Sequence, residues 1–315
     1  MWCKASFAKK GSNVPAQPTY ALNAVGAKDA LTPDIAEEIL ARVGEAAEAG
    51  KIEWLAEGRA LDIPFAGNPK NVKACFSAAS GASQDWRLDL NVVRREGRRK
   101  RLLVADMDST IIGCECIDEL ADMAGLKPQI AGITERAMRG ELDFEDAIKS
   151  RVALLKGLPL EALARVYAER VRLNPGAKAL IRTMRAHGAH CLLVSGGFTY
   201  FTSRVAAEAG FDGQTGNTLL DDGKVLTGEV GAPIFGRNAK LEALQNKAKA
   251  LGLALSETLA VGDGANDLKM IEAAGLGVAY RAKAVVAAAA DAAIDHGDLT
   301  ALLYLQGYRA SEIKR

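Results

Sequence analysis

The sequence is short of the residues and patterns on which several common activities depend. Only three histidines occur in 315 residues, and none accompanies a GxSxG nucleophile elbow, which argues against a Ser–His hydrolase. The glycine-rich turn at residues 262–268, GDGANDL, lacks both the Walker pattern GxxxxGK[ST] and the dinucleotide pattern GxGxxG. ATP and NAD binding therefore have no support, and no internal repeat is evident.

Net charge and long apolar runs are also lacking. Forty basic residues stand against 39 acidic ones, so a formal charge of +1 gives no electrostatic basis for binding nucleic acid or an anionic membrane. No apolar run approaches the ~20 residues of a membrane-spanning helix. The first residues carry lysines but no apolar core of a secretory signal. We interpret residues 1–19 as a disordered tail, or as the result of a start codon placed too early.

Five cysteines form an odd set without a disulfide framework, which predicts a reducing cytoplasmic environment. Cys114 and Cys116 make a C-x-C pattern near two aspartates. Thiolates suit Zn²⁺ rather than an acidic oxygen site, so we expect these two side chains to be buried or at the rim of a site. With 49% hydrophobic and 25% charged residues, the composition is that of an ordinary globular protein of one or two domains.

Residues 20–93 predict a small unit with the order β-α-β-β-α-β, which matches a ferredoxin-like split βαβ fold. Thr32 and Pro33 are residue types that favour an N-cap and a first helical position. The basic run at 94–101 is better interpreted as a solvated linker than as a nucleic-acid patch, because the whole chain is neutral. The expected elements are strand Tyr20–Val25, helix Pro33–Ala49, strands within Ile52–Phe65, helix Asn71–Ala79 and strand Trp86–Val93.

Residues 102–315 alternate short apolar strands with helices, which predicts a doubly wound parallel sheet covered on both faces. Residues of about 115–175 interrupt the pattern with helical segments and predict an inserted helical cap. The Ala-rich stretch 282–293 is interpreted as helix. The expected strands are Arg101–Ala105, His190–Ser195, Thr258–Gly262 and Gly277–Ala279, and the expected helices include Cys116–Ala124, Leu142–Lys156, Gly176–His187 and Ala239–Leu251.

Polar side chains follow three of these strands at the point where each one ends. Asp106 and Asp108 follow the first, Ser195 ends the second, and Asp263 and Asp267 follow the third. Ligands of such sheets bind beyond the carboxyl ends of the strands. A single aspartate there is as often a helix cap, but four converging carboxylates repel one another unless a cation compensates. Hard oxygen ligands favour Mg²⁺, so we expect a magnesium site.

Lys240 opens a predicted helix and brings a cation to the same region. A lysine on a helix is usually a surface residue, but beside a metal and a phosphate it becomes a partner for phosphate oxygens. The residues thus predict an acidic metal site joined by a hydroxyl and glycine amides that bind an anion.

These motifs resemble those of the haloacid dehalogenase superfamily of aspartate-nucleophile phosphohydrolases. The shared motifs are DMDST at 106–110, VSGG at 194–197, Lys240 and GDGANDLKMI at 262–271, in the expected order over residues 102–281. Longer segments resemble the members that hydrolyse phosphoserine: DMDSTIIGCECIDELA (106–121), GELDFEDAIKSRVALLKGL (140–158), VRLNPGAKALI (171–181), VSGGFTYFT (194–202) and TGEVGAPIFGRNAK (227–240). The element order of residues 20–93 resembles an ACT-like regulatory domain, though without a clear amino-acid-binding motif.

The resemblance implies a role for each matching residue. Asp106 would be the nucleophile and Asp108 the general acid and base. Mg²⁺ would be held by Asp106, by the carbonyl of Asp108 and by Asp263, with Asp267 nearby. The remaining roles are phosphate binding by Ser195, Gly196 and Lys240, and substrate binding by Glu115, Phe144, Arg151 and Asn266.

The expected substrate is O-phosphoserine, hydrolysed through an aspartyl-phosphate in the last step of serine biosynthesis. Three alternatives stay open: a phosphatase for phosphothreonine or another small phosphate, a phosphotransferase to an alcohol such as homoserine, and a non-catalytic amino-acid sensor. The less favoured alternatives are that Arg151 is a solvated helix residue and that Phe144 is part of the cap core. No nucleic-acid or membrane partner is expected, and a homodimer is one assembly open to the chain.

Overall fold

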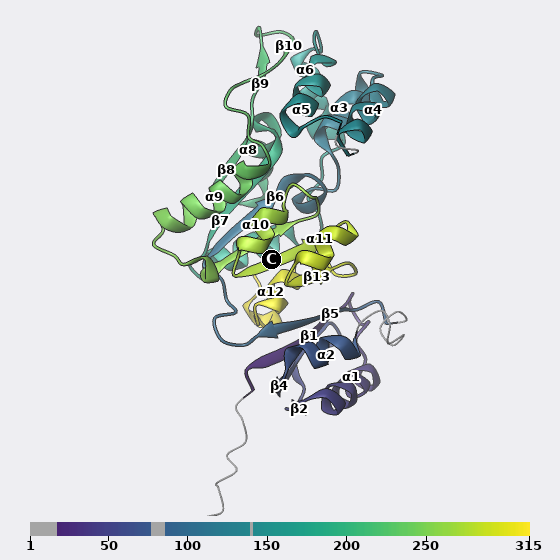
Figure 1. Ribbon diagram of the computed structural model, residues 1–315, viewed down its shortest axis with the longest axis vertical. Coiled ribbons are helices and arrows are strands. Elements are labelled where there is room, and N and C mark those ends of the chain that lie inside the picture. The colour runs from purple at the N-terminus through teal and green to yellow at the C-terminus, as the bar shows by residue number, and fades with distance from the viewer. Residues whose placement is uncertain (1–17, 77–85, 139–140) are drawn as a thin grey trace, which may run out of the picture.

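The computed structural model describes residues 18–76, 86–138 and 141–315, and two large sheets organise that part of the chain (Figure 1). Apart from Pro18 and Thr19, the predicted tail at 1–19 lies outside the described residues. None of the helices in the described ranges has the length and apolar character that a membrane span requires.

The N-terminal sheet is antiparallel and carries both of its helices on one face. Alternate residues of β1 divide between its faces, so Leu22 packs against the helices while Ala21 and Val25 pack against the rest of the chain. The first helix begins as the sequence predicts, with Thr32 accepting a hydrogen bond from the Ile35 amide at 3.3 Å. The strand order is β2-β4-β1-β5 with β3 beside β4, and the elements are β1 (Tyr20–Val25), α1 (Pro33–Ala46), β2 (Glu48–Ala49), β3 (Glu53–Ala56), β4 (Ala60–Ala66), α2 (Pro69–Cys75) and β5 (Asp89–Arg94).

The second sheet is parallel throughout, which confirms the predicted α/β class. Its strands are covered on both faces, so they are apolar without alternation. Three helices lie on each face of the sheet. In sheet order the strands are β13 (Ala292–Ile294), β12 (Leu276–Tyr280), β11 (Thr258–Gly262), β6 (Leu102–Asp106), β7 (His190–Phe198) and β8 (Gly213–Asn217). The helices are α7 (Ala177–Ala186), α8 (Thr199–Ala209) and α12 (Ala301–Leu305) on one face, and α9 (Arg237–Ala250), α10 (Leu268–Ala273) and α11 (Ala284–Ala289) on the other.

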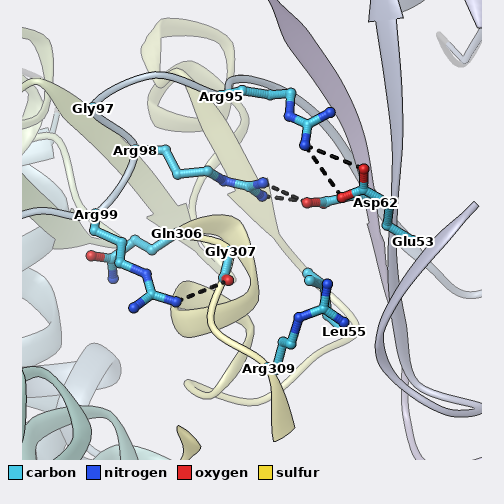
Figure 2. Close-up of a pocket in the computed structure, with 10 residues that line it drawn as sticks. All are labelled: Glu53, Leu55, Asp62, Arg95, Gly97, Arg98, Arg99, Gln306, Gly307 and Arg309. Atoms are coloured by element: carbon cyan, nitrogen blue, oxygen red, sulfur yellow. Dashed lines mark hydrogen bonds and ion pairs between the residues drawn. The ribbon is translucent and has the colours of Figure 1, made fainter. Parts of the chain in front are cut away.

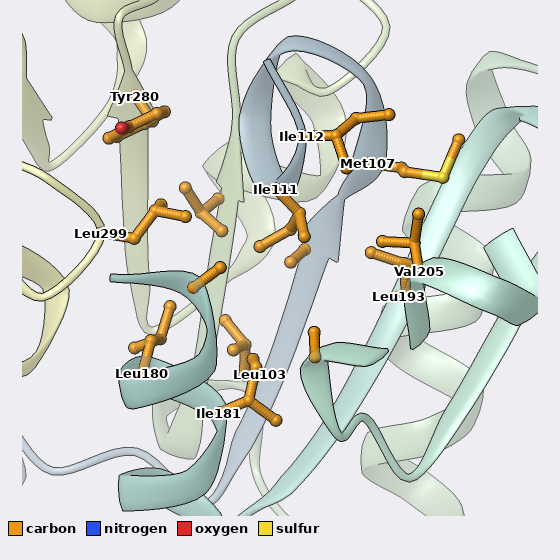
Figure 3. Close-up of a cluster of buried hydrophobic side chains, with 14 of the residues drawn as sticks. Leu103, Met107, Ile111, Ile112, Leu180, Ile181, Leu193, Val205, Tyr280 and Leu299 are labelled. Carbon is orange, nitrogen blue, oxygen red and sulfur yellow. The ribbon is translucent and has the colours of Figure 1, made fainter. Parts of the chain in front are cut away.

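The larger apolar cluster lies under the loop that follows β6 (Figure 3). Leu103 and Leu193 of the sheet meet Leu180 and Ile181 of α7 on one face of the central strands. Ile111, within the loop itself, is fully buried in the same cluster. Burial of this kind stabilises by roughly 25 cal/mol per Å² of apolar surface, so the loop is anchored by the core beneath it.

A helical insertion separates β6 from β7, and a hairpin from elsewhere in the chain lies against it (Figure 1). Main-chain hydrogen bonds join the two, from Gly157 N to Leu226 O at 2.8 Å and from Leu160 N to Lys224 O at 3.0 Å. The insertion contains α3 (Cys116–Met123), α4 (Lys127–Met138), α5 (Phe144–Ala153) and α6 (Leu160–Glu169), and the hairpin contains β9 (Leu219–Asp221) and β10 (Leu226–Val230). Short 3₁₀ turns occupy Leu255–Glu257 and Ala310–Glu312.

Several predicted boundaries were wrong. The helix expected to reach Ala49 ends at Ala46, because Glu48–Ala49 pairs with β4 instead. The Ala-rich stretch expected to be helical to residue 293 leaves the helix after Ala289 and enters β13. The sequence did not predict β8 or the β9–β10 hairpin, since GQTGN (213–217) contains few strand-forming residues and pairs along one edge only.

Most residues of the basic segment 94–101, which the sequence predicts to be a solvated linker, are exposed, but Arg98 and Lys100 are not (Figure 2). Arg98 donates to the buried Asp62 carboxylate through Nη1 at 2.5 Å and Nη2 at 3.1 Å, and its Nε donates to the Leu305 carbonyl. Lys100 is also buried, and burial lowers the pKa of its ammonium. Arg98 thus fastens the segment to β4 and to α12, beside a cleft of about 390 Å³.

Strand β5 attaches the N-terminal sheet to the parallel sheet through side chains that bind main-chain groups. Asp89 is buried and accepts hydrogen bonds from the amides of three consecutive residues, 295–297, at 2.7–3.0 Å. Burial raises the pKa of Asp89, although these three bonds act in the opposite direction. Asn91 donates to the Ala293 carbonyl and accepts from the Ala293 amide, both at 2.9 Å.

Replacing Arg98 by alanine should lower the free energy of unfolding by about 3 kcal/mol, because Asp62 would stay buried without its counter-ion. The matched control is Arg101→Ala, which removes an exposed ion pair with Glu257 from the same segment and should cost less than about 1 kcal/mol. Urea unfolding of both variants, followed by circular dichroism, measures the difference. Equal and small losses would show that the Arg98–Asp62 pair does not fasten the two sheets together.

Candidate active site

The site begins where β6 ends and the chain turns sharply. Asp106 is the last residue of the strand and is buried, and Asp108 follows in the turn Met107–Ile111. Ser109 adopts a left-handed conformation with φ of 56°, and its amide donates to the Cys114 carbonyl at 3.3 Å. Asp108 Oδ1 accepts a hydrogen bond from the Cys116 amide at 2.9 Å. One loop therefore holds both carboxylates, as their spacing predicts.

Lys240 lies between two carboxylates that are distant in sequence. Its Nζ is 2.6 Å from Asp106 Oδ1 and 2.6 Å from Asp267 Oδ1, and the lysine is only 1% exposed. Burial alone would lower the lysine pKa, but the charges of Asp106 and Asp267 raise it above its ordinary value. Burial and the charge of Asp267 raise the pKa of Asp106, against the attraction of Lys240. The two carboxylates thus favour the charged form of the ammonium beside Asp106.

Three carboxylates converge closely enough to hold one cation. Asp106, Asp263 and Asp267 each place an oxygen within 4.8 Å of the others. Asp263 accepts a hydrogen bond from Thr110 Oγ1 at 3.2 Å, and burial together with Asp267 raises its pKa to about 6. With Asp108, four carboxylates face one ammonium, and like charges this close favour a bound cation. All the donors are oxygen atoms, which suits a hard divalent ion.

Asp267 differs from the other two in that both its oxygens are already hydrogen-bonded. Oδ1 accepts from Lys240, and Oδ2 accepts from the Gly264 amide at 3.1 Å. A Cβ at Gly262 would lie 2.4 Å from Asp267 Cγ, so the glycine is required by this close approach. These bonds fit the outer position that the sequence predicts for Asp267.

Ser195 connects the last part of β7, where the pairing with β8 is irregular, to Asp108. Its Oγ donates to Asp108 Oδ2 at 3.0 Å and accepts from the Gly197 amide at 2.8 Å. Burial raises the pKa of Asp108, while the Cys116 and Ser195 hydrogen bonds lower it. A Cβ at Gly197 would lie 2.8 Å from Asp108 Oδ2, so no larger residue fits there. The hydroxyl of Ser195 and the amides of Gly196 and Gly197 lie where the sequence predicts an anion site. We call residues 195–197 the anion loop.

The helical insertion and its entry loop contribute the mouth of the site. Glu115 Oε1 accepts from Ser109 Oγ at 2.7 Å. Although Glu115 is exposed, partial removal from water and the charge of Asp108 raise its pKa to about 7. Arg151, on α5, is half-buried and feels the charges of Asp118 and Glu115, while burial lowers its pKa. The structure therefore brings Glu115 and Arg151 into one electrostatic environment.

Phe144 and Asn266 come from two different segments, the start of α5 and the turn after β11. The ring of Phe144, at the start of α5, would lie 3.1 Å from a Cβ at Gly196 and 3.4 Å from one at Gly236. Phe144 therefore packs on the anion loop rather than only within the insertion. Asn266 is half-buried, with its Oδ1 2.4 Å from where a Gly264 Cβ would lie.

Sequence reasoning missed residues that hold this site in shape. Thr110 binds Asp263, and Asn174 donates to the Thr110 carbonyl at 2.8 Å. Asn217 binds the Gly196 carbonyl at 2.8 Å. Thr110 could have been found from its place beside the two aspartates, but nothing local marks the asparagines. Cys116 is buried and Cys114 is partly buried, as expected, and both are free thiols.

Comparisons with known proteins agree with this arrangement. A family model of the haloacid dehalogenase-like hydrolases matches residues 103–272. The chain is 41% identical over 288 residues to the phosphoserine phosphatase of Streptomyces coelicolor, covering 90% of this chain and 70% of that one. It is 44% identical over 220 residues to the phosphoserine phosphatase of Archaeoglobus fulgidus, covering 69% and 64%. The match thus leaves more than a third of the Archaeoglobus protein uncovered.

A crystal structure of a probable phosphoserine phosphatase from Vibrio cholerae has a TM-score of 0.73 to this chain at 30% identity, covering 94% of this chain and 88% of that one. The family match includes β6, β7 and β11, whose ends carry the converging acids and the serine. It also spans more than half of the 315 residues. The chain therefore belongs to the haloacid dehalogenase-like hydrolase family.

Proposed function

We propose that this protein hydrolyses O-phosphoserine to serine and inorganic phosphate, as the last step of serine biosynthesis in the cytoplasm. The observation that carries the proposal is that one loop places Asp106 and Asp108 in two neighbouring hydrogen-bonded groups, one with Lys240 and the other with Ser195. Lys240 holds Asp106 at 2.6 Å, and Ser195 holds Asp108 at 3.0 Å. The two similar proteins from Streptomyces and Archaeoglobus, both phosphoserine phosphatases, support the choice of substrate.

In the first step Asp106 attacks the phosphorus atom and forms an aspartyl-phosphate. Lys240 occupies Oδ1 of this carboxylate, which leaves Oδ2 to attack. The bond between phosphorus and the seryl oxygen breaks, and protonated Asp108 gives its proton to that oxygen. Burial raises the pKa of Asp108, which favours the protonated form that this step needs. Splitting the hydrolysis in two lowers the barrier of each step.

In the second step water attacks the phosphorus of the aspartyl-phosphate. Asp108, now a carboxylate, takes the proton of the water, and the bond between phosphorus and the Asp106 oxygen breaks. Inorganic phosphate leaves, and both carboxyl groups return to their starting states. Ser195, the Gly196 amide and Lys240 hold the phosphoryl oxygens through both steps, since fixed donors stabilise the charge that develops there.

Mg²⁺ fits the donor set, and Asp106, Asp263 and the Asp108 carbonyl would hold it, with Asp267 beside them. When bound, it would neutralise charge between the anionic nucleophile and the anionic phosphate. At ~4 Å that repulsion is about 4 kcal/mol per charge pair for an effective dielectric of ~20. Lys240 alone does not balance the carboxylates, which supports a requirement for the metal.

Glu115 and Arg151 would select an amino-acid phosphate over other phosphomonoesters. A carboxylate opposes an ammonium, and a guanidinium binds a carboxylate through two parallel hydrogen bonds. The substrate would lie between them with its phosphate toward Ser195, and Phe144 and Asn266 would line its path. The contact of Phe144 with the anion loop supports this position.

The finer architecture follows from the same reading. The helical insertion would act as a cap over the site, and residues 20–93 would form an ACT-like domain, which the strand order β5-β1-β4-β3 supports. Residues 102–315 would form the phosphatase domain.

Asp106→Asn should reduce kcat by at least about 10⁴-fold, because an amide cannot form the acyl-phosphate. Phosphate release from O-phosphoserine in the presence of Mg²⁺ measures the loss. Asp122→Asn, which changes an exposed aspartate of α3 to its amide, should retain full activity. A tenth or more of wild-type kcat in Asp106→Asn would contradict the nucleophile assignment.

Arg151→Lys should raise KM for O-phosphoserine by about 10- to 100-fold, because lysine keeps the charge but loses the planar fork. The KM for p-nitrophenyl phosphate, which has no carboxylate, should change less than about threefold by the same reasoning. Arg165→Lys, at an exposed ion pair on α6, is the matched control. A panel with phosphothreonine, sugar phosphates and an acceptor alcohol tests the substrate itself. Preference for another ester, or transfer to the alcohol, would replace our choice.

The affinity for O-phosphoserine should fall as pH decreases through about 7, the pKa of Glu115 in the metal-free protein. Below that pH the carboxyl is protonated and no longer attracts an ammonium, and a bound cation would move the midpoint lower. The ratio of kcat/KM for O-phosphoserine to that for p-nitrophenyl phosphate isolates this effect, since both esters share the titration of the phosphate. Glu115→Gln should make the ratio independent of pH. A ratio that is already flat in the wild type would exclude Glu115 as the ammonium partner.

A further inference from the structure

Asn217, the last residue of β8, uses its whole side-chain amide on the main chain of two other segments. Its Nδ2 donates to the Gly196 carbonyl at 2.8 Å and to the Phe235 carbonyl at 3.1 Å. Its Oδ1 accepts from the Phe235 amide at 2.6 Å. The residue is only 1% exposed. An asparagine amide has two N–H donors and one carbonyl acceptor, so each of these groups has a partner here.

The first of these segments is the anion loop. The Gly196 carbonyl belongs to the peptide group that joins Gly196 to Gly197, and the N–H of that group donates to Ser195 Oγ at 2.8 Å. The hydrogen bond from Asn217 therefore orients the peptide group next to the Gly196 amide, which would hold a phosphoryl oxygen. The end of β8 also lies close to the loop: a Cβ at Gly216 would be 3.1 Å from the Gly197 carbonyl oxygen. Asn217 thus orients the anion loop from the buried side of that loop, and it does not contact the substrate itself.

The second segment leads directly into the helix that carries Lys240. Phe235 precedes Gly236, the N-cap of α9, and Lys240 lies in the first turn of that helix. By binding both the amide and the carbonyl of Phe235, Asn217 mimics a β-bridge and fixes where α9 begins. Phe144 packs on Gly196 and Gly236, one residue from each of the two segments. The amide of Asn217 therefore ties together the two surfaces that Phe144 contacts.

The chain between Asn217 and Phe235 is the β9–β10 hairpin, whose far part is bonded to the helical insertion. Leu226 accepts from the Gly157 amide at 2.8 Å and donates to the Leu158 carbonyl at 2.9 Å. Asn217 closes the base of this hairpin, because its side chain bonds to Phe235, 18 positions further along the chain. The far part of the hairpin is thus bonded to the helical insertion, and its base is bonded to the anion loop.

We infer that Asn217 is a positioning residue that holds the anion loop and the start of α9 in the geometry that phosphoryl transfer requires, and that it connects this geometry to the helical insertion. The inference rests on the proposed phosphatase activity. Because the two segments serve the phosphoryl group rather than the amino acid, loss of Asn217 should affect every phosphomonoester alike. This differs from loss of Arg151, which should affect phosphoserine alone.

Asn217→Ala should lower kcat/KM by about 100-fold for both O-phosphoserine and p-nitrophenyl phosphate, and weaken inorganic phosphate binding at least about tenfold by calorimetry with Mg²⁺, since loop donors supply effects of this size. Asn91→Ala is the matched control. Asn91 is also buried and also binds a main-chain amide and carbonyl, but at the junction of the two sheets. It should lose thermal stability to a similar extent and keep kcat/KM within about twofold of wild type, because its partners lie outside the site.

A folded Asn217→Ala with kcat/KM within threefold of wild type would overturn the inference, as would an equal loss in Asn91→Ala. Asn217→Ser keeps one donor and one acceptor and should show a smaller loss with the same equality between substrates. If the alanine variant does not fold, the serine variant decides by the same criteria. If the wild-type protein cleaves p-nitrophenyl phosphate but not O-phosphoserine, the proposed substrate is wrong. The role of Asn217 is then still tested by the kcat/KM of its variants for p-nitrophenyl phosphate. If the wild type cleaves neither ester, the phosphatase proposal fails, and phosphate binding to the two variants still tests Asn217.

Discussion

A lysine ammonium held between two buried carboxylates is the interaction on which the rest of the site depends. Lys240 joins Asp106 at the end of β6 to Asp267 after β11, and it comes from a third segment, α9. Removing one member of such a buried group typically costs about 3–5 kcal/mol, because a charge is left without compensation. The three segments can therefore meet only when the apolar strands beneath them are fully packed.

The residues proposed for catalysis and those proposed for substrate selection belong to different parts of the chain. The acids and the serine lie in or just after the last residues of central strands. These strands are apolar and covered on both faces, so close packing in the core fixes their positions. Glu115, Phe144 and Arg151 belong to the helical insertion and its entry loop. The two proposed sets of residues thus have separate structural supports, and the β9–β10 hairpin with Asn217 links one to the other.

Sequence reasoning predicted the strands whose residues are uniformly apolar, because burial on both faces of a parallel sheet demands that composition. It located Asp106, Asp108, Ser195 and Asp263 because they follow such strands directly. It could not predict β8, whose residues GQTGN gain their strand form from pairing with β7 alone. It also missed Asn217 and Asn174, since their partners are main-chain groups of distant segments and leave no mark in the neighbouring sequence. The buried part of the 94–101 segment was missed for a similar reason, since composition does not reveal that Arg98 pairs with the distant, buried Asp62.

The attachment of the N-terminal sheet has a consequence for how the sequence can change over evolutionary time. Asp89 and Asn91 bind only main-chain amides and a carbonyl of residues 293–297. Every non-proline residue offers those same groups. Substitutions at 293–296 that preserve the backbone leave the contact intact, whereas Asp89 and Asn91 have no such freedom. Gly297 is also constrained, because a Cβ there would lie 2.9 Å from Asp89 Oδ2. The junction therefore concentrates its selective constraint on one partner and lets the other drift.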